Sequence, residues 1–115
     1  MAITQAYGGT WTSTLTETIL NTTTPETTVG IYQVFVGIDP LVLGDTIEIR
    51  IRDRVLSTTP QRTLLTASVG PADPSPDDNC WVGPSLILMH GWDVTLKQIA
   101  GTVGKLTPWS IRKVA

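Results

Sequence analysis

The clearest pattern in the sequence is the strict alternation of apolar and charged residues between Asp45 and Arg54. Successive side chains of a β-strand point to opposite faces of its sheet. The two faces of this segment carry Ile47, Ile49 and Ile51 on one side and Glu48, Arg50, Arg52 and Arg54 on the other. Because a slip of one residue would bury the charges, the pattern fixes the register. It predicts a half-buried strand of an antiparallel sheet with one face in water.

The rest of the chain reads as further short strands separated by turn-forming residues. Threonines alternate with other residues over 10–20, and the segment 31–36 is apolar on both faces, which is typical of a central strand. The remaining strands are expected over 62–69, 84–89, 92–98 and 109–114. The strands at 84–89 and 92–98 are expected to form a hairpin around His90-Gly91. About seven short strands without a helical segment predict an all-β fold, a single antiparallel β-sandwich of the jelly-roll or Ig-like kind.

A chain of 115 residues is expected to form one domain. The paired glycines Gly8-Gly9 permit backbone angles that other residues avoid, so residues 1–9 are expected to form a flexible N-terminal arm. The sandwich domain is then expected over 10–115. The longest loop is expected over 70–79, where prolines and aspartates exclude both a helix and a sheet ladder.

The charge content, the single cysteine and the length of the apolar runs limit which partners and which cellular compartment we expect. Only 16% of the residues are charged, which suggests that part of the surface is covered by a partner, and the net charge of −2 offers no attraction for nucleic acid or anionic lipid. Cys80 is the single cysteine, as suits a reducing cytoplasm. The sequence shows no signal peptide and no apolar run long enough to span a bilayer, so we expect a soluble protein without a membrane partner.

Candidate catalytic and metal-binding residues are few. His90 is the single histidine and lies at an expected turn, where an exposed or capping role is favoured over catalysis. Cys80 and His90 are too few ligands for a tetrahedral zinc site. A calcium site is disfavoured because the acidic loop lacks the turn glycine and terminal glutamate of such sites; its residues are Asp73, Asp77, Asp78 and Asn79. We therefore expect no enzyme, no metal and no cofactor.

Two groups of side chains leave a binding role open. A basic stripe could meet phosphates, but cross-strand pairing with Asp53, Asp93 or Glu17 is its ordinary explanation and is favoured; the stripe comprises Arg50, Arg52, Arg54 and Lys97. A second group could stack on sugars but is more readily explained as core in a chain with one phenylalanine; it comprises Trp11, Trp81, Trp92 and Trp109.

Four segments carry a family resemblance, and they are 30–36, 43–50, 91–102 and 109–114. Their succession of strand, short link and strand resembles small structural proteins encoded among the virion genes of tailed bacteriophages. The resemblance implies a capsid cement or decoration protein, commonly a trimer, that binds the major capsid protein and stabilises contacts between capsomers. It implies a location on the capsid surface of the virion after assembly in the host cytoplasm.

Under this interpretation the arm and one apolar strand are expected to supply the partner contacts. The expected interface residues are Ile3, Tyr7, Leu86, Ile87, Leu88 and Met89. Two alternatives stay open, a tail or baseplate component and a carbohydrate-binding module, since both can be built on a β-sandwich without a catalytic site.

Overall fold

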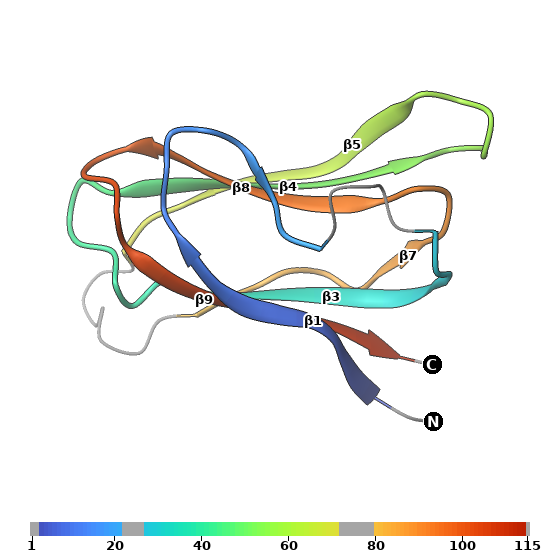
Figure 1. Cartoon of the computed structure of the whole chain (residues 1–115), viewed down its shortest axis with the longest axis horizontal. Coiled ribbons are helices and arrows are strands. Elements are labelled where there is room, and N and C mark those ends of the chain that lie inside the picture. Colours follow the sequence, from blue (N-terminus) through green and yellow to red (C-terminus); the bar gives the residue numbers. More distant parts are fainter. Residues whose placement is uncertain (1–2, 22–26, 72–79, 115) are drawn as a thin grey trace.

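The computed structural model describes residues 3–21, 27–71 and 80–114, which form two antiparallel sheets packed face to face (Figure 1). The strands are β1 (Ile3–Thr12), β2 (Thr18–Ile19), β3 (Gly30–Gly37), β4 (Thr46–Arg54), β5 (Gln61–Val69), β6 (Cys80–Val82), β7 (Leu86–Leu88), β8 (Asp93–Ala100) and β9 (Leu106–Val114). Sheet A has the order β1-β9-β3, and both β6 and β7 pair with the free edge of β3. Sheet B has the order β2-β8-β4-β5. The expected all-β sandwich is confirmed, with nine strands among the described residues where about seven were expected.

The register predicted for the alternating segment is confirmed in β4. This strand lies between β8 and β5, and its three isoleucines are at most 1% exposed. The alternation also has a consequence that the sequence analysis missed, because it carries Asp53 to the same inner face, where that residue is 4% exposed. A buried carboxylate must find hydrogen-bond donors, and Asp53 accepts bonds from the backbone N–H groups of Met89 and His90, both at 3.0 Å.

The core lies between the two sheets and is centred on Trp92. The indole of Trp92 is fully buried, lies 4.4 Å from the ring of Tyr32 and 6.2 Å from that of Tyr7, and donates to the Thr28 carbonyl. The other buried hydrophobic residues are Trp11, Val34, Val36, Ile38, Leu41, Ile47, Ile49, Ile51, Leu88, Val94, Leu96 and Ile111. Trp81 and Trp109 pack against this cluster while half-buried. The interpretation of the tryptophans as core residues is therefore confirmed for Trp11 and Trp92 and holds in part for the other two.

The expectation of a flexible arm over residues 1–9 is wrong for the part that the structure describes. Residues 3–9 belong to β1 and pair with β9 along its whole length. Packing does not demand glycine at either position: a Cβ at Gly9 would lie 3.6 Å from the Trp109 ring, an ordinary contact distance, and one at Gly8 would meet only the flexible end of the Gln5 side chain. The strand expected over 10–20 ends at Thr12, and a loop leads to β2.

The expected hairpin around His90-Gly91 is also wrong. β7 pairs with β3 in sheet A, whereas β8 pairs with β4 in sheet B, so residues 89–92 cross from one sheet to the other. Asp53 holds this crossing by the two hydrogen bonds described above. No helix among the described residues has the length and apolarity needed to span a bilayer.

Candidate functional site

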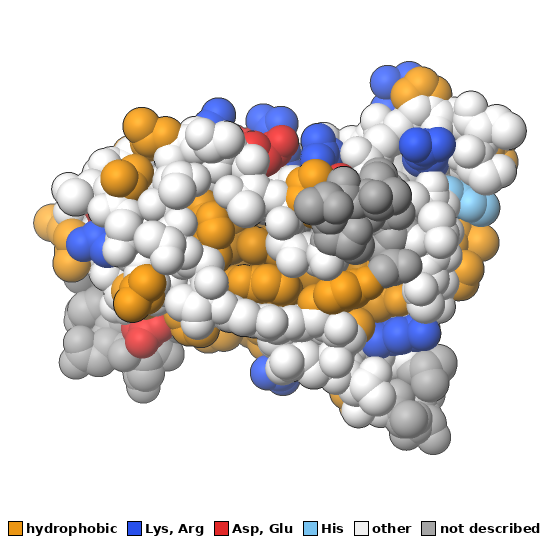
Figure 2. Space-filling view, in the orientation of Figure 1, with side chains coloured by type: hydrophobic (Ala, Val, Ile, Leu, Met, Phe, Trp, Pro, Cys, Tyr) orange, Lys and Arg blue, Asp and Glu red, His pale blue; other side chains and the backbone are white. Residues whose placement is uncertain are grey.

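Three loops meet at one end of the sandwich, drawn on the left in Figure 1, and expose aliphatic side chains there. We call the segments 13–16, 38–45 and 101–105 the loop end. Leu43 is 94% exposed at the tip of the second segment. The exposed aliphatic residues of the loop end are Leu15, Val42, Leu43 and Val103. In the space-filling view, separate hydrophobic side chains lie among other atoms at this end of the molecule (Figure 2).

The buried carboxylate of Asp45 joins two of the three loops. Its Oδ2 accepts a hydrogen bond from the Val42 N–H at 3.0 Å, and its Oδ1 accepts one from the Thr102 N–H at 3.0 Å. The Lys105 ammonium lies 3.7 Å from Oδ2. Gly101 has a positive φ of 90°, and a Cβ there would overlap the Asp45 side chain, so this position requires glycine. One carboxylate therefore fixes the loops that carry Leu43 and Val103.

The third loop, 13–16, is attached through Ser13 and through the Gln98 backbone N–H, which donates to the Thr14 carbonyl at 2.8 Å. The Ser13 hydroxyl accepts from the Lys105 N–H at 2.8 Å, and the Ser13 backbone exchanges further bonds with Lys105 and Gly104, both at 2.9 Å. The Gln98 side-chain amide, fully buried, donates to the carbonyl of Thr102 at 2.9 Å. The loop end is thus a preorganised apolar surface, since its backbone is held from below by buried polar groups.

The pKa of Asp45 lies below its usual value. The hydrogen bond from Val42 has the largest effect, the Thr102 N–H and the Lys105 charge act in the same direction, and burial opposes them. A carboxylate with a lowered folded-state pKa stabilises the fold at pH values above its unfolded-state pKa of about 3.9. That stabilisation is lost as the pH falls through the folded-state pKa.

We therefore expect Asp45→Asn to destabilise the protein at neutral pH, with a difference from the wild type that shrinks as the pH is lowered from about 5 towards 2. Urea unfolding curves of both proteins across this range measure the difference. Asp39→Asn, measured at a protein concentration at which the chain is monomeric, is the matched control, because Asp39 is exposed and makes no ion pair among the described residues. A difference between wild type and Asp45→Asn that stays constant with pH would contradict the linkage.

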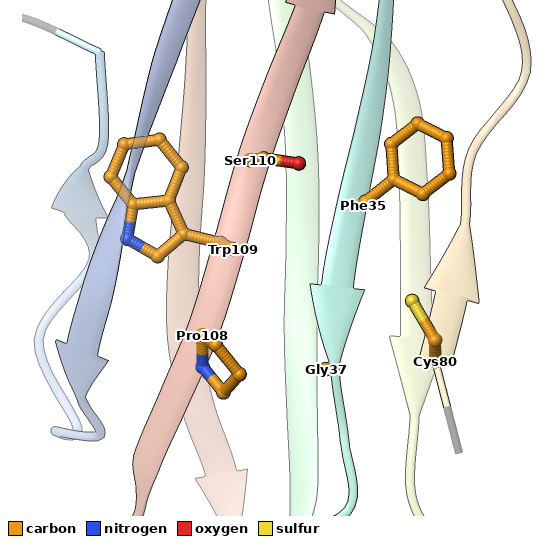
Figure 3. Close-up of a pocket in the computed structure, with 6 residues that line it drawn as sticks. All are labelled: Phe35, Gly37, Cys80, Pro108, Trp109 and Ser110. Carbon is orange, nitrogen blue, oxygen red and sulfur yellow. The ribbon is translucent and has the colours of Figure 1, made fainter. Parts of the chain in front are cut away.

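The outer face of sheet A forms a second apolar surface. Phe35, Pro108 and Cys80 surround the position of Gly37, where no side chain fills the face (Figure 3). The result is a shallow groove of about 290 Å³, lined by Phe35, Gly37, Cys80, Pro108, Trp109 and Ser110. Two charges flank it. The Arg112 guanidinium lies 3.8 Å above the Phe35 ring, and a Cβ at Gly37 would lie 3.3 Å from Oδ1 of Asp39.

The outer face of sheet B is polar and internally paired. Arg52 forms a two-pronged ion pair with the buried Asp93, at 2.8 and 3.1 Å, and Glu17 lies 3.6 Å from Arg52 and 3.9 Å from Arg50. The pKa of Arg52 lies above its usual value because it donates hydrogen bonds to Asp93 and is attracted by both carboxylates, against the cost of burial. Charged side chains line the upper margin of Figure 2, over this sheet. Pairing with Asp93 and Glu17 is confirmed for Arg50 and Arg52. Arg54 and Lys97 form no ion pair among the described residues, and Asp53 takes no part because it points inward.

The residues expected at a partner interface are dispersed by the fold. Leu88 is 0% exposed and belongs to the core, so its assignment to an interface is wrong; Leu86, on the same inner face, is half-buried. Tyr7 also packs on the core, against Trp92. Ile3, Ile87 and Met89 are exposed. Ile3 and Ile87 lie in one row across sheet A, because Ile3 pairs with Val114, Val114 with Ile31, and Ile31 with Ile87.

The candidate catalytic and metal-binding residues do not come together in the part of the fold that the structure describes. His90 is half-buried and its backbone N–H is bound to Asp53, whereas Cys80 lies exposed at the groove. Within the three described segments, no three histidine, cysteine, aspartate or glutamate side chains gather as metal ligands. The calcium candidates Asp73, Asp77, Asp78 and Asn79 lie outside the described residues.

The loop end was not among the surfaces expected from the sequence, although the sequence carries a signal for it. Val42-Leu43 precedes the turn residues Gly44-Asp45, and two aliphatic residues in a turn are an exception to the polar composition of loops. Turn residues predict the loop, but the exposure of Leu43 depends on the distant partners of Asp45, which no local pattern encodes.

No protein-family model matches this chain, and no curated protein matches it. Among solved structures, the chain is similar to the Eiger TNF of S. frugiperda, with 17% sequence identity over 96% of this chain and 87% of that chain and a TM-score of 0.46.

Proposed function

We propose that this protein is a virion structural protein of the capsid cement or decoration type, which binds the major capsid protein on the outer face of a phage head. The loop end carries this proposal. Three loops held in place by Asp45, Ser13 and Gln98 expose aliphatic side chains that find no core to cover them. A preorganised surface loses little conformational freedom on binding, so more of the contact energy remains as affinity.

A cement protein needs contact area and repetition. Burying one aliphatic side chain contributes roughly 1.5–3 kcal/mol to binding. When many copies bind across neighbouring capsomers, their binding free energies together stabilise the shell, and no catalytic group is needed. The pairing of Arg50 and Arg52 with acidic side chains on sheet B fits this role, because these two cations are already compensated and attract a polyanion less.

The location is tested by immunogold electron microscopy on phage particles whose genome carries this gene. We expect labels distributed over the head. Labels confined to the tail would support the tail or baseplate alternative and overturn the capsid assignment, and unlabelled particles would overturn both.

We expect Leu43→Ser to weaken binding to purified heads by about tenfold, since it removes one fully exposed aliphatic contact from the surface. Its free energy of unfolding should stay within about 0.5 kcal/mol of the wild type, because the side chain touches no core. Co-sedimentation of the protein with heads at increasing concentration measures the affinity. Leu64→Ser is the matched control, since Leu64 is exposed on β5, outside the loop end. Equal affinities of both variants would show that the loop end is not the binding surface.

A further inference from the structure

We propose that the outer face of sheet A is a self-association surface, on which a second copy of this chain packs about a two-fold axis. This inference concerns the isolated protein and does not depend on the proposed virion role. It starts from the shape of the face. Phe35 and Gly37 lie two residues apart on β3 and therefore face the same side, about 7 Å apart. Phe35 carries a half-buried ring on this face and Gly37 carries no side chain, so the ring stands next to a hollow that Pro108 and Cys80 border (Figure 3). Pro108 narrows this hollow, since its Cγ would lie 2.8 Å from a Cβ at Gly37.

A projection beside a gap can be complementary to its own copy. In a two-fold interface the same patch is used by both subunits, so each feature meets its complement on the partner. We place the axis in the plane between the two copies, across the strands and level with Val36. This axis brings Phe35 of one copy over the Gly37 gap of the other, and the same contact occurs twice.

The charges follow the same symmetry. The Arg112 guanidinium lies over Phe35, and the Asp39 carboxylate lies beside Gly37 and Pro108. An axis that exchanges the positions of Phe35 and Gly37 therefore brings Arg112 of one copy to Asp39 of the other. Neither side chain has an ion-pair partner among the residues that the structure describes. Two intermolecular ion pairs would compensate both charges.

The size and polarity of the face fit such an interface. The three long strands β1, β9 and β3, together with the three-residue strands β6 and β7, cover roughly 500 Å² per copy at about 3.3 Å per residue and 4.8 Å between strands. The total of about 1,000 Å² is the smallest that a specific interface needs. Arg112 is the one charged residue that β3, β6 and β9 direct to this face. The outward residues of the three strands are Ile31, Gln33, Phe35, Gly37, Cys80, Val82, Leu106, Pro108, Ser110, Arg112 and Val114.

The arrangement has a consequence for the loop ends. An axis across the strands reverses their direction, so the two copies would present their loop ends at opposite ends of the dimer. The interface is a dimer, whereas the phage resemblance implies a trimer, and the size of the isolated protein distinguishes the two.

The test is sedimentation equilibrium of the full chain and of a charge-swap series. We expect the wild type to dimerise, Arg112→Asp and Asp39→Arg each to raise the dimer Kd by about tenfold, and the double variant to recover most of this loss. Both residues are exposed, so the substitutions leave the core intact. Arg62→Asp, which makes the same charge change on an exposed position of β5, is the matched control and should leave the Kd unchanged.

Recovery in the double variant separates a direct contact from a general effect of net charge. A wild type that stays monomeric up to millimolar concentration would overturn the proposal. So would a trimer that tolerates both single variants, or a double variant no better than either single one. None of these outcomes bears on the proposed virion role, which the binding of Leu43→Ser to heads tests separately.

Discussion

Replacing Trp92 with alanine should lower the free energy of unfolding by about 3–5 kcal/mol, a large part of the 5–15 kcal/mol that stabilises a typical domain. The indole is fully buried between the two sheets and contacts Tyr32 and Tyr7. Its N–H donates to the Thr28 carbonyl at 3.2 Å, which also accepts from the Tyr32 hydroxyl at 2.9 Å. The substitution therefore leaves a large cavity and loosens the segment that leads into β3.

Urea unfolding followed by circular dichroism measures this loss. Trp109→Ala is the matched control, because the same atoms are removed from a half-buried ring that packs on Gly9 at the margin of the core. We expect its effect to be about half as large, since water already reaches part of that ring. Equal losses for the two variants would mean that the centre of the core does not lie at Trp92.

The architecture was predictable wherever one face of a strand is buried and the other is wet. In β4 the alternation of isoleucine with charged residues predicts both the strand and its register, and the structure confirms both. The expectation of a central β3 rested on Tyr32, Val34 and Val36, which face the core, with Phe35 on the opposite face. These predictions succeed because burial of a strand face depends on its own residues.

The pairing of strands was not predictable, because it depends on residues far apart in the chain. The segments 84–89 and 92–98 look like a hairpin, yet the strands they contain join different sheets. Gly8-Gly9 reads as a flexible point in isolation, whereas in the fold both glycines lie within β1 and pair with Ser110 and Trp109 of β9. The same glycines support either interpretation until the partner strand is known.

The loop end and the groove were harder to predict for the same reason. Asp45 resembles any turn aspartate in the sequence, but its second hydrogen bond comes from Thr102, 57 residues away. The groove requires Gly37, Cys80 and Pro108 from three different strands. Local patterns can indicate which residues are exposed, and only the topology brings the exposed residues into one surface.

Asp53 gives the second large effect that we expect. Its side chain is buried and accepts hydrogen bonds from three backbone N–H groups, those of Met89 and His90 at 3.0 Å and that of Arg54 at 2.7 Å. Asp53→Ala would leave these donors without an acceptor in a place that water does not reach easily. We expect the free energy of unfolding to fall by about 2–4 kcal/mol.

The effect of Asp53→Ala should be local as well as global. Because Met89 and His90 lie where the chain crosses from sheet A to sheet B, hydrogen exchange of their amides should accelerate more than that of β4 amides such as Ile49. Asp53→Asn retains one side-chain oxygen and should recover part of the stability. Asp39→Ala, which removes an exposed carboxylate, should cost less than about 0.5 kcal/mol at a protein concentration at which the chain is monomeric. A loss in Asp53→Ala no greater than in Asp39→Ala would mean that the crossing between the sheets is held by packing alone, without the buried carboxylate.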